Sequence, residues 1–442
     1  MARNHSGSQF AITVKYSVRI EAISLIMSLK TNSIATVGFT VLLSATSYGL
    51  NSTAARLLTP SETSKVVILW TAMNMAILLF QSPIEALAPR IRSALQIDQG
   101  DVSLNLLVTT YFLVSALILS VGTIAISLIV LQVSSVIALT ATFFLLSHSI
   151  FYWQKVLLFA RNDFSTILKK SYLVFLSALV SFGTLMVLDC SQISFLFIAV
   201  AISYLLPLTF KSTQDLKDLF IDRSKFSASL RYFRKSGIFH DLASLIFGNA
   251  VSLLILVGGV LFAPLKELDP SQIVTYSAMI SLSMVPMLVL NSLVLPMVLQ
   301  AVIYVENQDY SKIWNFYLRT VFGFTCTIFL VATPYLLFGN YLISFFIGSQ
   351  YKVSNPSFFL VAIATGLAAI TGVPRLLLTS IGGVRTFNKF LLISFVLYVV
   401  VVYLSPNSMS AFISGSVFSS LMLLVAGTIL IRQITSRNYE NA

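Results

Sequence analysis

The sequence is poor in charged residues, and above all in acids. Among 442 residues it has 16 Asp and Glu and 28 Lys and Arg, so charged residues make up 10% of the chain, against roughly 25% in an ordinary soluble domain. So few charges cannot cover a water-exposed surface, which excludes a soluble globular enzyme and a disordered protein. The hydrophobic content of 57% and the mean hydropathy of +0.89 indicate a polytopic helical membrane protein.

Cysteine and histidine are also scarce. Cys190 and Cys326 stand in or beside apolar runs, so thiols cannot staple a secreted domain or build a metal site. No cluster of His, Cys and Asp has the spacing of metal ligands, and we predict neither a metal nor a cofactor. The pattern G-x-x-x-x-G-K-[ST] is missing as well, which excludes an ATP-hydrolysing loop of that kind.

Apolar runs long enough to cross a bilayer recur along the whole chain. A spanning helix needs about 20 apolar residues, and lipid does not tolerate unpaired backbone, so we expect helices rather than strands. Twelve such runs predict an all-α polytopic membrane protein with about 12 transmembrane helices. The runs are 33–53, 64–89, 104–131, 134–158, 171–188, 192–210, 241–263, 273–300, 314–338, 356–381, 390–404 and 408–431.

The basic residues predict the orientation. With both termini in the cytoplasm, 21 of the 28 basic residues fall in cytoplasmic segments, and the other seven fall in outside loops or within the runs. Cytoplasmic loops of membrane proteins carry such an excess of Lys and Arg. We therefore expect a multi-pass protein of a cell membrane with both termini cytoplasmic. Topology and attraction to anionic membrane lipids explain the net charge of +12, and no nucleic acid partner is needed.

Short sequence echoes at nearly one offset indicate a duplicated six-helix unit. RLLTPSE at 56–62 resembles KELDPSQ at 266–272, and each reads as a helix start with an N-cap, Pro at the first helical position and a Glu or Gln that closes a capping box. Two more pairs of similar tetrapeptides lie at 100–103 and 308–311 and at 155–158 and 375–378. Duplicated halves are a transporter architecture, with the substrate site between them.

The duplication sets the predicted domain boundaries. We expect two pseudo-symmetric six-helix lobes, an N-lobe over 33–210 and a C-lobe over 240–431. The basic linker between them, 211–239, is predicted to be cytoplasmic and to hold an amphipathic helix at the membrane surface. A cytoplasmic or interfacial segment over 1–32 precedes the N-lobe, and a cytoplasmic tail over 432–442 follows the C-lobe.

Three short stretches carry a family resemblance. RLLTPSE at 56–62 follows the first run, LRYFRKSG at 230–237 precedes the seventh, and LFGNYLISFFIGSQY at 337–351 precedes the tenth. They look like the R-x-L-G-P-E, L-L-x-F-G-x-P and F-G … L-F-G-x-x-Y motifs of polysaccharide-export flippases. That family belongs to the multidrug/oligosaccharidyl-lipid/polysaccharide (MOP) exporter superfamily. Thr59 departs from the pattern, because it stands where the family has glycine.

The resemblance implies a MOP-flippase-like fold and a transporter rather than an enzyme. Such flippases move undecaprenyl-diphosphate-linked oligosaccharides or polysaccharide repeat units from the inner to the outer leaflet of the bacterial inner membrane by alternating access. The implied substrate is therefore a lipid-linked sugar. The implied partners are the glycosyltransferases or the polymerase of an export pathway.

Five basic residues are candidates for binding an anionic headgroup, because a cation inside a membrane is unfavourable unless something offsets it. Lys155 and Arg375 correspond in the two halves, so both can point into one central cavity, or both can snorkel to the inner headgroups. Arg319 lies near the inner end of the ninth run, where snorkelling is the alternative. Arg56 and Lys266 form a second pair at the outer mouth, or else are exposed cations beside helix caps.

Glu85 is the one acid well inside a run. Its carboxyl is either a proton or sodium site of a coupled exporter or a structural partner for Lys155 or Arg375. A second hypothesis is accordingly an ion-coupled drug or metabolite exporter of the same superfamily, with Glu85 as the coupling site. A membrane-embedded sugar-transfer enzyme is a third, against which the few acids and short external loops count. A scaffold within an export complex is a fourth. His148, in the fourth run, reads as an interior histidine.

Overall fold

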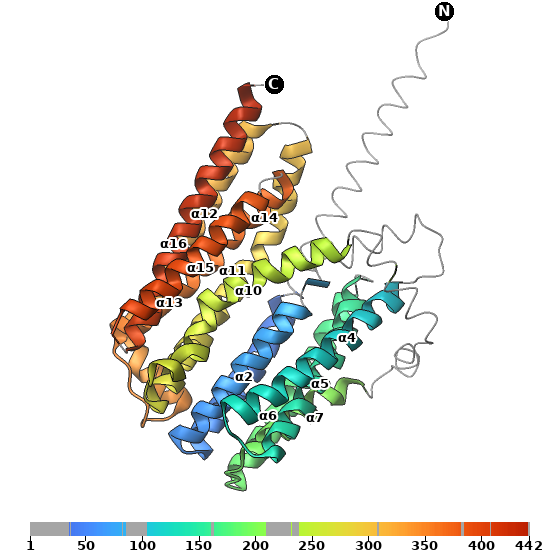
Figure 1. The fold of residues 1–442 in the computed structure, drawn as a ribbon, viewed down its shortest axis with the longest axis vertical. Helices are drawn as coiled ribbons and strands as arrows, with labels where there is room; N and C mark the ends of the chain where they lie inside the picture. Colours follow the sequence, from blue (N-terminus) through green and yellow to red (C-terminus); the bar gives the residue numbers. More distant parts are fainter. Residues whose placement is uncertain are drawn as a thin grey trace, which may run out of the picture.

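Over their described residues the twelve predicted runs are largely helical in the computed structural model, and the run 356–381 is divided at Thr371 into two helices (Figure 1). The structure describes residues 35, 37–81, 83–84, 104–160, 163–208, 231, 238–306, 309–381, 384–406 and 408–440. The N-lobe contains the first helix (37–57), α2 (Pro60–Phe80), α4 (Leu104–Ala125), α5 (Ser135–Ala160), α6 (Phe164–Val187) and α7 (Ile193–Leu205). The C-lobe contains α10 (Ile238–Phe262), α11 (Pro270–Glu306), α12 (Tyr310–Ile347), α13 (Asn355–Ile370), α14 (Gly372–Ile381), α15 (Val384–Leu404) and α16 (Met409–Glu440).

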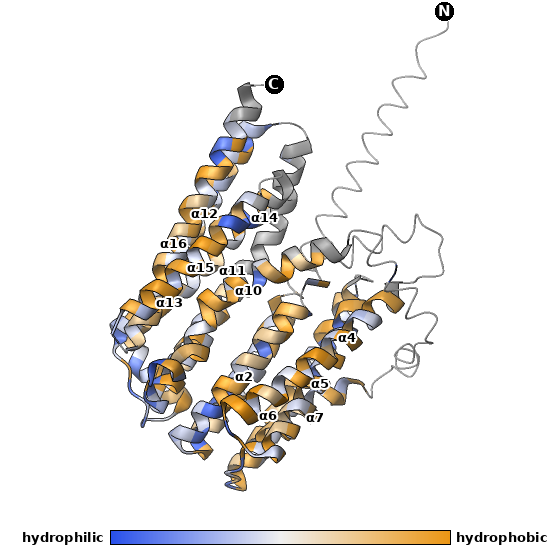
Figure 2. Cartoon of the chain, viewed as in Figure 1, coloured by the Kyte–Doolittle hydropathy of each residue, from blue (hydrophilic) through white to orange (hydrophobic). Residues whose placement is uncertain are grey.

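The surface of the helices fits lipid rather than water. Within the described residues, nine helices are long and apolar enough to cross a membrane. Large apolar side chains such as Leu117, Val180 and Phe322 are exposed on the outside of the bundle, whereas hydroxyl groups such as that of Ser203 are buried. Figure 2 shows the hydrophobic residues along the helices and the hydrophilic ones gathered towards the helix ends. The protein is therefore a multi-pass membrane protein.

The two lobes repeat one packing pattern. In the N-lobe, α5 packs on α4 and α7, and α6 packs on α7; in the C-lobe, α13 packs on α12 and α16, and α15 packs on α16. Helices in the same order thus make the same contacts, as a duplicated six-helix unit requires. Figure 1 shows the N-lobe (blue to green) beside the C-lobe (yellow to red), and they meet where α2 contacts α10 and α11.

The predicted domain boundaries fall largely outside the residues that the structure describes. The N-terminal segment (1–32) and most of the linker (211–239) are not among the described residues. These boundaries stay predictions, and so does the amphipathic helix of the linker.

The helix starts that suggested the duplication are present. Thr59 caps α2: its hydroxyl accepts from the N–H of Glu62 at 3.4 Å, and the Glu62 carboxylate accepts from the N–H of Thr59 at 3.2 Å, which is a capping box. At the corresponding place before α11, the Asp269 carboxylate accepts from the N–H of Ser271 at 2.7 Å. Hydrogen bonds from the side chain and backbone of Ser271 lower the pKa of Asp269 below its ordinary value.

Close packing of α12 against α13 predicts a sharp response to added volume. A Cβ at the buried Gly366 would lie 2.5 Å from Cγ2 of Ile328 on α12. We expect Gly366→Val to destabilise the C-lobe by about 1–3 kcal/mol, the usual range for overpacking, and to lower the melting temperature in detergent. Gly323→Val on α12 is the matched control, because nothing lies within 4 Å of its added Cβ. Equal melting temperatures for the two variants would contradict this packing.

Candidate functional site

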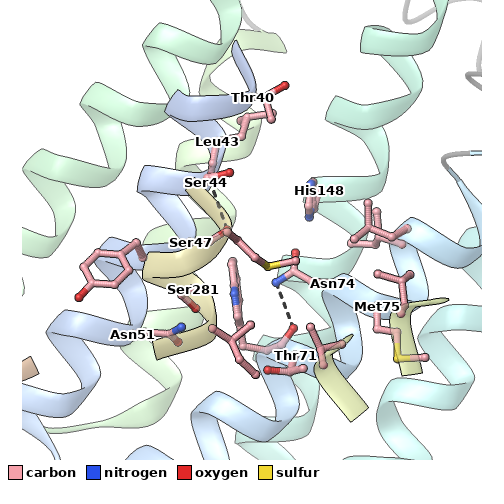
Figure 3. Close-up of a pocket in the computed structure, with 18 of the residues that line it drawn as sticks. Thr40, Leu43, Ser44, Ser47, Asn51, Thr71, Asn74, Met75, His148 and Ser281 are labelled. Atoms are coloured by element: carbon pink, nitrogen blue, oxygen red, sulfur yellow. Dashed lines mark hydrogen bonds between the residues drawn. The ribbon is translucent and has the colours of Figure 1, made fainter. Parts of the chain in front are cut away.

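A cavity of about 300 Å³ lies between the lobes. The first two helices of each lobe form its walls, and α5 and α7 complete it on the N-lobe side. Thr40, Ser44, Ser47 and Asn51 recur every three or four residues on the first helix, so they share one helix face. Figure 3 shows them together with Asn74 of α2 around the cavity. The N-lobe wall is therefore a polar surface inside a membrane protein.

The helix α5 adds the charge of the site. Among the described residues that line the cavity, Lys155 is the one charged side chain. Lys155 is 9% exposed, and its Nζ lies 4.5 Å from the ring centroid of Tyr152 and 5.0 Å from that of Phe39. These distances are those of cation–π contacts, which help to offset the burial of a charge. Two turns earlier, His148 stacks on Tyr204 with ring centroids 4.4 Å apart.

The C-lobe wall has a different character. The helix α10 contributes Leu253, Val257 and Val260, which are all apolar and lie at helical spacing. The helix α11 adds the hydroxyls of Ser277 and Ser281 between apolar neighbours. The cavity thus has one polar wall and one mostly apolar wall, and it suits an amphipathic ligand.

Hydrogen bonds join the two lobes beside one end of the cavity. Ser52 donates its hydroxyl hydrogen to the carbonyl of Phe346. The Arg56 guanidinium donates from Nη2 to the carbonyl of Phe345 at 2.5 Å and from Nε to that of Phe346 at 3.5 Å. Both carbonyls belong to the last turn of α12, where helix carbonyls have no partner within the helix.

Two more contacts join the lobes at this end. Gln350 donates from Nε2 to the carbonyl of Ala55 at 3.0 Å, and the ring of Tyr48 meets that of Phe346 edge-on with centroids 5.0 Å apart. We call the contacts of Ser52, Arg56 and Gln350 with the opposite lobe the latch. Arg56 was predicted to be a headgroup ligand or an exposed cation beside a cap. It is exposed three residues before the N-cap Thr59, as the second reading expects, and its guanidinium also joins the two lobes.

Arg375 does not join Lys155 in the cavity. It lies within the C-lobe, where its Nη1 donates to Oδ1 of Asn249 on α10 at 3.2 Å. The guanidinium occupies space that Gly248 leaves open, since a Cβ there would come within 2.2 Å of Nη2. Arg375 is thus absent from the described residues that line the cavity, because α10 offers it room and an acceptor.

The other predicted residues lie elsewhere. Lys266 donates from Nζ to the carbonyls of Tyr403 at 3.1 Å and Ser405 at 3.3 Å, so its contacts stay within the C-lobe. Arg319 is exposed on α12. Glu85 lies outside the described residues. In the described part of the chain, no group of three His, Cys, Asp or Glu side chains could hold a metal ion.

The polar wall of the cavity was not predicted from the sequence. Its signal was present, because Thr40, Ser44, Ser47 and Asn51 stand at helical spacing in an otherwise apolar run. Polar side chains on a membrane helix face the protein interior or a wet cavity. Serine and threonine can also bond to the carbonyl four residues earlier in their own helix, as Ser47 does to Leu43. The pattern alone therefore does not decide whether these side chains line a cavity or only bond to their own helix.

Solved structures with the same arrangement of helices identify the fold. An inward-facing multidrug resistance MATE family transporter of the MOP superfamily superposes with a TM-score of 0.66 at 10% identity, over 91% of this chain and 99% of that one. An outward-facing MATE family transporter of the MOP superfamily has a TM-score of 0.55 at 12% identity, over 93% of this chain and 96% of that one. The Vibrio cholerae MATE transporter VcmN in its bent form has a TM-score of 0.53 at 10% identity, over 94% of this chain and 98% of that one.

The chain has the fold of a MATE transporter of the MOP superfamily. At these identities the likeness concerns the MATE fold alone, and it confirms the predicted two-lobed membrane architecture. No protein-family model and no curated protein matches the sequence.

In this MATE fold the cavity is predicted to be open to water. In a background with Cys190 and Cys326 changed to Ser, we expect Ser47→Cys and Asn74→Cys to react with a charged methanethiosulfonate reagent at least about tenfold faster than Ser203→Cys, because thiol reactivity follows exposure. Ser203 is the control, since it is fully buried on α7 away from the cavity lining. Equal rates at the three positions, followed by mass spectrometry, would contradict a wet cavity.

Proposed function

We propose that this protein translocates an anionic lipid-linked sugar of the undecaprenyl-diphosphate type from the inner to the outer leaflet of a bacterial cell membrane. The observation that carries the proposal is the cavity between the lobes. Its described lining has one cation, Lys155, and no carboxylate. A buried cation attracts an anionic group strongly, because little water screens the interaction.

The two walls suit the two parts of such a lipid. The polar N-lobe wall offers hydroxyl, amide and imidazole groups to a diphosphate–sugar headgroup. The apolar α10 side offers Leu253, Val257 and Val260 to the first part of a prenyl chain. The expected partners are the glycosyltransferases or the polymerase of an export pathway, which make or consume such lipids.

Transport by alternating access fits the latch beside one end of the cavity. The latch joins the lobes at the end of the bundle where the first helix and α12 both finish. The helix α16 finishes at the opposite end of the bundle (Figure 1). With cytoplasmic termini, the latch lies on the outer side, and the protein is inward-facing. The higher TM-score against the inward-facing transporter than against the outward-facing one supports this assignment.

An ion-coupled exporter of drugs is the second candidate. The observation in its favour is that the solved structures with this fold include multidrug resistance transporters. A cationic drug would bind best beside a carboxylate, and no described lining residue supplies one. Glu85 is the carboxyl that this candidate needs.

A reconstitution assay separates the two candidates. In vesicles, wild-type protein should move a fluorescent polyprenyl-diphosphate sugar across the bilayer, as read by chemical quenching from outside. Lys155→Ala should slow this transport about tenfold or more, because the headgroup loses a charged partner. Lys155→Arg should keep much of the rate. Lys169→Ala is the control, since Lys169 is exposed on α6 away from the cavity lining.

Two outcomes would count against the proposal. Wild-type rates in Lys155→Ala would remove this residue from the headgroup site. Proton-driven efflux of cationic drugs that Glu85→Gln abolishes, without any transport of the lipid-linked sugar, would favour the exporter instead.

A further inference from the structure

Three polar atoms on the N-lobe wall have no hydrogen-bond partner. They are the hydroxyl oxygen of Tyr48, Oδ1 of Asn51 and Nδ1 of His148, all from residues that line the cavity. Asn51 is only 5% exposed. Buried polar atoms in proteins are nearly always hydrogen-bonded, and an unmade bond is unfavourable. These atoms therefore mark places where water or a ligand group in the cavity can supply the partner.

Two of these atoms lie far from the cation of the site. Lys155 lies over the ring of Phe39, whereas Asn51 is three turns further along the same helix. At 1.5 Å per residue, the two positions are about 18 Å apart along the helix axis. Tyr48 and Asn51 are therefore at the latch end of the cavity, next to Ser52, and Lys155 is at the other end.

The chemistry of the latch end does not match a phosphate. The amide oxygen of Asn51 can only accept a hydrogen bond. An ionised diphosphate offers acceptors alone, so it cannot satisfy this oxygen. A sugar hydroxyl can, because it donates and accepts, and the hydroxyl of Tyr48 can exchange hydrogen bonds with a neighbouring one in the same way.

We propose that Tyr48 and Asn51 form a sugar subsite, which binds hydroxyl groups of the transported saccharide while Lys155 binds its diphosphate. This rests on the proposed function and adds an orientation, in which the sugar points to the latch and the diphosphate lies at the opposite end of the cavity. Because the ring of Tyr48 also packs on Phe346, the bound sugar contacts a residue that touches the latch.

Binding in detergent tests the subsite with defined probes. These are farnesyl diphosphate and a panel of farnesyl diphosphates that carry one hexose or N-acetylhexosamine. Quenching of tryptophan fluorescence reports binding, since Trp70 lines the cavity. At least one sugar-bearing probe should bind wild type about tenfold more tightly than farnesyl diphosphate, which is the effect of satisfying buried polar groups.

The variants separate the two ends of the cavity. Asn51→Leu and Tyr48→Phe should each remove most of the sugar preference and leave the Kd for farnesyl diphosphate unchanged. Lys155→Gln should weaken all probes by a similar factor and keep the preference. Tyr335→Phe is the matched control: its hydroxyl donates to the carbonyl of Leu282 in the C-lobe, and it does not line the cavity.

Each contrary result has a separate meaning. If no sugar-bearing probe binds wild type more tightly, or if both subsite variants keep the preference, the sugar subsite is wrong and the proposed function stands. If wild type binds none of the diphosphates, the proposed function itself fails. Hydroxyls could also come from the glycerol headgroup of a phospholipid. Dihexanoyl phosphatidylglycerol, which has this headgroup, and dihexanoyl phosphatidic acid, which lacks it, test that source. A preference for the glycerol headgroup that Asn51→Leu removes would overturn the assignment to sugar.

Discussion

Hydrocarbon cannot hydrogen-bond, and the rest of this structure depends on that constraint. Every backbone group in the membrane must find its partner within a helix, which makes the fold a bundle of helices. A polar side chain on those helices must likewise face inwards or bond to a carbonyl of its own helix, as Thr327 does to that of Gly323 in an exposed hydrogen bond. The serines, threonines and asparagines of the first helix and α2 therefore meet at the boundary between the lobes, and the cavity lies there because no lipid could solvate them.

The latch uses the same constraint at the end of a helix. The final carbonyls of α12 have no partner in their own helix, and side chains of the opposite lobe supply one. Such a contact involves few groups, and water can replace them when the lobes separate. It can therefore hold one conformation without fixing it, which the proposed alternating access would require. Asn51 in the cavity and Ser52 in the latch are neighbours in the chain, so a ligand at one lies beside the other.

Local patterns in the sequence predicted the features that depend on local physics. Run length and hydropathy located the helices, and the spacing of Thr59, Pro60 and Glu62 located a helix start, because a capping box involves one turn of chain. A charge inside an apolar run marked Lys155 as a candidate, since burial of a cation needs a reason, but it did not decide between the cavity and snorkelling. These inferences needed no knowledge of which helices are neighbours.

The remaining features depend on contacts between distant segments. Arg56 and Phe345 are 289 residues apart, and no local pattern relates them. Arg375 shares a motif with Lys155, yet Gly248 and Asn249 of another helix draw it away from the cavity. Equivalence in a sequence repeat thus fixed the position of the residue on its helix but not the partner of its side chain.

Pulsed electron resonance distances between spin labels would test the central claim, that the lobes alternately close the two ends of one cavity. The labels are attached to cysteines introduced in a background without native cysteine. One pair replaces Ser61 and Lys352, which are exposed on opposite lobes at the latch end. The other pair replaces Lys169 and Lys389, which are exposed on opposite lobes at the other end. When a polyprenyl-diphosphate sugar is added to protein in lipid nanodiscs, we expect the first distance to lengthen while the second shortens. Two distances that stay constant, or that change in the same direction, would contradict it.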